Sequence, residues 1–132
     1  MFGVTEPEHN LFEICKQLVL LEAHLFDESK RCPDCITKHF LSVIGYADEL
    51  PTLDSTGEIS RAIANVSPYC RSMFSCWSGG DDPVAIATGL RTVRKQLQPI
   101  IVECCKSRGV AFAYESEANH PELDPMCVRG CA

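Results

Sequence analysis

Four side chains of types that can bind metal ions or take part in redox chemistry lie close together in the chain: His24, Cys32, Cys35 and His39. The last three stand at i, i+3 and i+7, so a helix that begins near Pro33 places them on one side. A preceding antiparallel helix brings His24 level with them. Two histidines and two cysteines suit tetrahedral Zn²⁺ with no open position, which is a structural rather than a catalytic site. We therefore predict a structural zinc site formed by these four residues.

The same segment, Cys32-Pro-Asp-Cys35, also has a redox interpretation. A cysteine at a helix N-terminus gains thiolate stability from the helix dipole, and a C-x-x-C pair can close as a disulfide. In this respect it is similar to the sulfhydryl oxidases of the Erv/ALR family, four-helix bundles in which an aromatic residue follows the C-x-x-C, as Phe40 does here. The chain lacks counterparts of that family's W-x-x-x-H and C-x-x-H-N-x-V-N segments. We therefore expect no flavoenzyme. There are two alternatives to zinc. One is a structural disulfide, and the other is a packed histidine beside two unlinked thiols.

Nine cysteines are many for a chain whose first residues lack the basic and apolar regions of a secretory signal. No apolar run approaches the ~20 residues that cross a bilayer. We expect synthesis in a reducing compartment, where cysteines are thiols or metal ligands unless a later step oxidises them. The two cysteines of the C-terminal segment could then join it to the long helix before it. The disulfide candidates are Cys32, Cys35, Cys104, Cys105, Cys127 and Cys131.

Apolar residues at helical spacing predict the elements that position this site. Leu11, Ile14, Leu18, Leu21 and Leu25 form one stripe, and a short polar turn joins that helix to the next, so the two are antiparallel neighbours. We expect an all-α antiparallel bundle of four or five helices over residues 1–109, followed by an irregular extended tail over 110–132. The expected helices cover about 8–27, 33–50, 58–65, 68–77 and 83–108, with breaks before Pro51 and Pro68 and a kink at Pro99.

Charge and motif content exclude several classes of function. The 132-residue chain has a net charge of −6, which disfavours nucleic acid and anionic membranes as partners. Arg91, Arg94 and Lys95 are expected to form a solvated helix face. The sequence contains no P-loop, no G-x-G-x-x-G and no Ser/His/Asp arrangement. We therefore do not expect an enzyme.

Three segments carry a resemblance to a known group of proteins: 16–25 (KQLVLLEAHL), 30–40 (KRCPDCITKHF) and 89–97 (GLRTVRKQL). They resemble small helical proteins encoded by large DNA viruses of algae and amoebae. The resemblance implies a structural virion or minor capsid protein, made in the host cytoplasm, that holds neighbouring capsid subunits together. Large DNA viruses often encode a thiol oxidase, so disulfides could form during assembly. A zinc-stabilised adaptor and a C-x-x-C thiol oxidoreductase are the alternatives.

Overall fold

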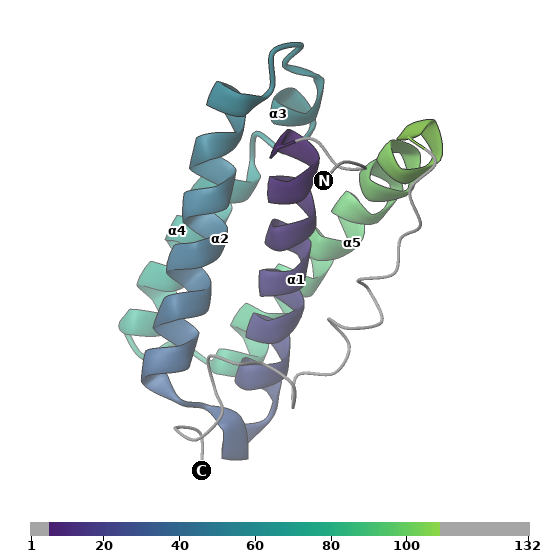
Figure 1. Ribbon diagram of the computed structural model, residues 1–132. Coiled ribbons are helices and arrows are strands. Elements are labelled where there is room, and N and C mark those ends of the chain that lie inside the picture. Colours follow the sequence, from purple (N-terminus) through teal and green to yellow (C-terminus); the bar gives the residue numbers. More distant parts are fainter. Residues whose placement is uncertain (1–5, 109–132) are drawn as a thin grey trace.

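Five α-helices and one 3₁₀ turn make up the part of the chain that the structure describes. The computed structural model describes the backbone of residues 6–108 and the side chains of residues 7–103. No strand occurs in this range, so the prediction of an all-α bundle is confirmed. The elements are α1 (Glu6–Phe26), η1 (Glu28–Lys30), α2 (Pro33–Leu53), α3 (Glu58–Ala62), α4 (Val66–Ser78) and α5 (Pro83–Arg108) (Figure 1).

Helix α1 holds the bundle together. It packs against α2 on one side and against α5 on the other, and α2 packs in turn against α4 (Figure 1). Its predicted apolar stripe is fully buried, as expected for a helix covered on two sides. None of the described helices is both long and apolar enough to cross a membrane. The members of the stripe are Leu11, Ile14, Leu18, Leu21 and Leu25.

The turn between α1 and α2 is short, and Asp27 caps its start. The carboxylate of Asp27 accepts a hydrogen bond from the backbone N–H of Ser29 at 3.0 Å and another from its hydroxyl. These two hydrogen bonds lower the pKa of Asp27. Pro33 occupies the first turn of α2, where a missing N–H costs nothing. The chain therefore reverses over η1, and α2 runs back along α1.

Three predicted helix boundaries were wrong, two of them at prolines. Helix α3 ends at Ala62 and not near residue 65. Helix α2 continues past Pro51 and ends at Leu53, because a proline in the last turn removes only one hydrogen bond of the helix. Helix α4 begins at Val66 and not at Pro68, which lies in its first turn, where no intrahelical N–H bond is required. Pro99 lies inside α5.

A capped turn joins α2 to α3. Burial raises the pKa of Asp54, but hydrogen bonds from Ser60 and Thr56 outweigh it, so that this pKa is lowered. Gly57 has a φ of 76°, in the left-handed region that other residues adopt at a cost. Together these residues start α3 directly after the turn.

Helix α4 contributes an aromatic cluster and a close contact with α5. The ring centroids of Phe40 and Phe74 lie 5.2 Å apart, and Trp77 lies 6.2 Å from each of them. These contacts join α4 to α2. On its other side, the hydroxyl of Tyr69 lies directly over Gly89 of α5, where a Cβ would be only 2.0 Å from it. A larger residue at that position would therefore require the Tyr69 side chain to move.

Candidate functional site

The residues predicted to bind zinc lie at the closed end of the α1–α2 hairpin. We refer to His24, Cys32, Cys35 and His39 as the hairpin cluster. His24 is in the last turn of α1, Cys32 is the N-cap of α2, and Cys35 and His39 follow on α2. His24, Cys35 and His39 are 1%, 3% and 0% exposed, whereas Cys32 is partly exposed. Most of the cluster is therefore inside the bundle.

The two histidine rings of the hairpin cluster pack against each other. Their centroids are 5.3 Å apart and their planes differ by 22°, which is a stacked arrangement. Nδ1 of His24 lies 2.9 Å from the backbone carbonyl oxygen of Lys30, and Nδ1 of His39 lies 2.5 Å from Oε1 of Gln17. The structure therefore brings the two rings together across the hairpin, as the sequence predicted.

These hydrogen bonds determine which ring nitrogen carries the proton. A carbonyl oxygen only accepts, so Nδ1 of His24 donates to Lys30. The amide of Gln17 presents its oxygen to His39, so Nδ1 of His39 also donates. Both rings therefore donate a hydrogen bond from Nδ1, to different partners.

The structure does not gather the whole hairpin cluster around one point. Among the described side chains, no three of the types His, Cys, Asp and Glu converge closely enough to hold a metal ion. Nor does a disulfide join any of the described cysteines, which are Cys15, Cys32, Cys35, Cys70 and Cys76. The remaining disulfide candidates, Cys104, Cys105, Cys127 and Cys131, lie outside the described side chains, as does the predicted tail over 110–132.

Sequence reasoning missed a second polar contact of α1. The buried carboxylate of Glu22 accepts hydrogen bonds from Arg91 at 3.0 Å and from Arg94 at 3.2 Å, both on α5. The guanidinium of Arg91 also lies 4.5 Å above the ring of Phe26. We call these four residues the α1–α5 clamp. The expectation of a solvated face was wrong for Arg94, whose side chain is only 18% exposed.

The two thiols of α4, Cys70 and Cys76, have raised pKa values. Burial raises the pKa of Cys70 to about 12. A hydrogen bond with Asp81 raises the pKa of Cys76, and burial adds to this effect. Because the thiolate is the nucleophile, both residues are poorly suited to redox chemistry near neutral pH.

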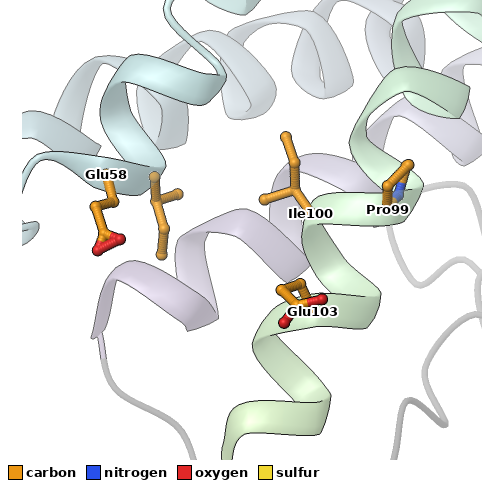
Figure 2. Close-up of a pocket in the computed structure, with 5 residues that line it drawn as sticks. Glu58, Pro99, Ile100 and Glu103 are labelled. Carbon is orange, nitrogen blue, oxygen red and sulfur yellow. The ribbon is translucent and has the colours of Figure 1, made fainter.

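A groove opens between α3 and the C-terminal part of α5. It has a volume of about 390 Å³ and is lined by Glu58, Ile59, Pro99, Ile100 and Glu103. In Figure 2, Glu58 comes from α3 on one side of the groove, and Pro99, Ile100 and Glu103 come from α5 on the other. Its lining therefore combines apolar side chains with two carboxylates. No sequence motif indicated it, because its two sides are far apart in the chain.

Comparison with protein-family models, curated proteins and solved structures finds no match to this chain. The resemblance to small viral proteins thus stays a prediction that rests on the three segments quoted above. Function has to be argued from the burial, contacts and charges of the chain's own residues.

Proposed function

We propose that the protein is a structural, non-catalytic component of a virion, of the minor capsid type, that holds neighbouring subunits together. The observation that carries this proposal is the burial of the hairpin cluster, in which His24, Cys35 and His39 are at most 3% exposed. A general base or nucleophile must reach its substrate within hydrogen-bond distance. Side chains enclosed between two packed helices are instead suited to holding those helices together.

The groove supports the partner-binding part of the proposal. Ile59, Pro99 and Ile100 offer apolar contact, while Glu58 and Glu103 place negative charge beside it. The neighbouring Val102 adds an exposed apolar side chain to the same end of α5. Complementary charge would select a partner segment that carries apolar side chains together with lysine or arginine. Such a segment on a neighbouring capsid subunit is the occupant that we propose.

The proposed location in the virion rests on the resemblance to proteins of large DNA viruses. A small acidic helical domain fits that role, because its net charge of −6 disfavours binding to the packaged nucleic acid. The burial of Cys35 and the raised pKa of Cys70 and Cys76 favour this role over thiol oxidoreduction.

Purified particles of the source virus provide the test. Mass spectrometry should find the chain at a constant ratio to capsid subunits across a density gradient. A zero-length reagent that couples carboxylates to amines should link Glu58 or Glu103 to a lysine of a neighbouring subunit. Absence of the chain from the particles would overturn the proposal, as would turnover by the purified chain in a thiol-oxidation assay.

Two matched variants connect the groove to this association. Ile100→Asp puts a charge into the groove, whereas Leu41→Asp changes a side chain that is 54% exposed on α2. We expect Ile100→Asp to reduce incorporation into particles at least tenfold and Leu41→Asp to leave it unchanged. Circular dichroism and thermal melting of both variants separate a lost contact from a lost fold. Equal incorporation of two folded variants would contradict binding at the groove.

A further inference from the structure

We infer that the C-terminal segment 110–132 packs back onto the outward face of α1, the side of that helix that points away from the core of the bundle. The inference goes beyond the structural role proposed above, which concerns the groove at the end of α5. It rests on burial, on the course of the helices and on charge. The members of the outward face are Phe12, Lys16, Val19, Leu20 and Ala23.

The helical repeat identifies the outward face. Successive residues of an α-helix are turned by about 100°, so Lys16 and Leu20, each two positions from the core residue Leu18, lie about 160° around α1 from it. Helix α2 is bonded to α1 at Gln17 and α5 at Glu22, and both of these residues lie within about 100° of Leu18. The two neighbouring helices are therefore centred on the other side of α1.

The outward face of α1 is more buried than that of its neighbour. A helix at the surface of a bundle exposes the side opposite the core, and on α2 the residues there, Lys38, Leu41 and Gly45, are exposed. On α1, no residue from 11 to 26 is exposed, and Leu20 is only 3% exposed. The outward face of α1 thus has the burial of a covered surface, although α2 and α5 lie on its other side.

The buried side chain at the centre of this surface is separate from the main core. The core cluster of the bundle includes Leu18 and Leu21, the nearest leucines of α1 along the chain. Leu20 is not a member of that cluster, and neither is Cys35 of α2, although each is 3% exposed. A buried apolar side chain touches several others. The cover of Leu20 and Cys35 therefore comes from outside the core that the described helices form.

The course of α5 brings the C-terminal segment to this face. Glu22, near the end of α1, bonds Arg91, near the start of α5, so the two helices are antiparallel and α5 ends beside the first turns of α1 (Figure 1). The 21 residues of α1 extend over about 31 Å. Roughly ten residues of extended chain cover that distance. The segment 110–132 is therefore long enough to follow the whole outward face.

The composition of the segment matches the outward face in order. Residues 110–114 (VAFAY) are apolar, and residues 115–124 (ESEANHPELD) carry several carboxylates and no lysine or arginine. Along α1, the face begins with Phe12 and continues with Lys16 one turn later. A segment that starts beside the N-terminal end of α1 thus brings apolar side chains to Phe12 and then carboxylates to Lys16. A second copy docked face to face would instead bring two Lys16 ammonium groups together.

Coupling of carboxylates to amines tests the position of the segment. An equal mixture of unlabelled and nitrogen-15-labelled full-length chain is treated with a zero-length reagent, and the linked peptides are identified by mass spectrometry. We expect Lys16 to be linked to Glu115 or Glu117 within one isotopic form. Lys38, which is exposed on α2, is the matched control and should form no link to the segment. Links of mixed isotopic composition would overturn the inference in favour of a second copy. Equal linking of the two lysines, or no link to Lys16, would also overturn it.

Proteolysis of the full-length chain tests the contact with Leu20. Chymotrypsin cleaves after Phe112 and Tyr114 when the segment leaves the helix. Leu20→Asp puts a charge beneath the segment and should raise the rate of this cleavage roughly tenfold, whereas Leu41→Asp, at a side chain 54% exposed on α2, should leave it unchanged. Circular dichroism of each variant checks the helical fold. Lys16→Glu, expected to raise the rate roughly threefold, decides the question if Leu20→Asp does not fold. An unchanged rate in the folded variant would overturn the inference and leave the proposed role of the groove intact.

Discussion

Two of the polar contacts made by helix α1 differ in kind. Within the hairpin, His24 bonds the backbone carbonyl of Lys30 and Gln17 bonds the ring of His39, and both histidines are buried. Toward α5, helix α1 offers Glu22, whose charge is met by Arg91 and Arg94. The first contact depends on hydrogen bonds to groups within the hairpin. The second depends on opposite charges and stays in contact with solvent through Arg91, whose side chain is 48% exposed. One helix thus joins its neighbours by two mechanisms that respond differently to mutation and to salt.

The largest effect is expected where a charge loses its partner. Glu22→Ala leaves both arginines of the α1–α5 clamp without their carboxylate in a partly buried position, and should lower the free energy of unfolding by about 3 kcal/mol. Urea denaturation monitored by circular dichroism measures this. The control Glu103→Ala removes an exposed carboxylate of α5 and should change the free energy of unfolding by less than about 0.5 kcal/mol. Similar losses in the two variants would show that the clamp contributes nothing specific.

A smaller effect is expected in the α1–α2 hairpin. His39→Leu removes the group that bonds the buried amide of Gln17, and should cost about 2 kcal/mol of unfolding free energy. The double variant Gln17→Leu/His39→Leu should recover part of this loss, because replacing both partners of a buried hydrogen bond costs less than replacing one. Chemical denaturation with a chelator present gives both values. Additive losses in the double variant would argue against coupling between the two side chains.

Arg91→Lys should weaken the α1–α5 clamp less than Glu22→Ala does. Lysine keeps the charge but loses the planar group that lies over Phe26 and bonds Glu22, so we expect a loss of about 0.5–1 kcal/mol. A double-mutant cycle with Phe26→Leu isolates the part due to the aromatic ring. A zero coupling energy in that cycle would assign the loss to the hydrogen bond alone.

The smallest expected effect is a difference in how the two contacts respond to salt. At 1 M NaCl the screening length falls to about 3 Å, so the cost of Glu22→Ala, which removes a charge, should shrink by a few tenths of a kcal/mol. The cost of His39→Leu should stay the same, because its hydrogen bond joins two buried side chains and Gln17 carries no charge. Parallel urea titrations at low and high salt measure the two differences. A salt-dependent His39→Leu cost would show that His39 is charged in the folded protein.

The hairpin contact is local in the chain and the α1–α5 clamp is not, and this explains which of them could be predicted from the sequence. Helical spacing and capping residues predicted the five helices, and the short turn predicted that His24 and His39 meet across the hairpin. Pairing of Glu22 with Arg91 spans 69 positions, and spacing within one helix carries no information about which distant helix packs against it. The groove was missed for the same reason. The helix ends at Pro51 and Pro68 were misjudged because packing against neighbouring helices extends a helix through a proline near its end.

The hydroxyl of Tyr69 above Gly89 has a mechanical consequence for α5. A displacement of α5 along its axis by one turn would bring Ile86 or Val93 beneath that hydroxyl, where a branched side chain meets the same obstruction as any Cβ at Gly89. Sliding of α5 past α4 by one turn therefore requires the Tyr69 side chain to move first. The contact between Tyr69 and Gly89 thus helps to keep the register of the two helices.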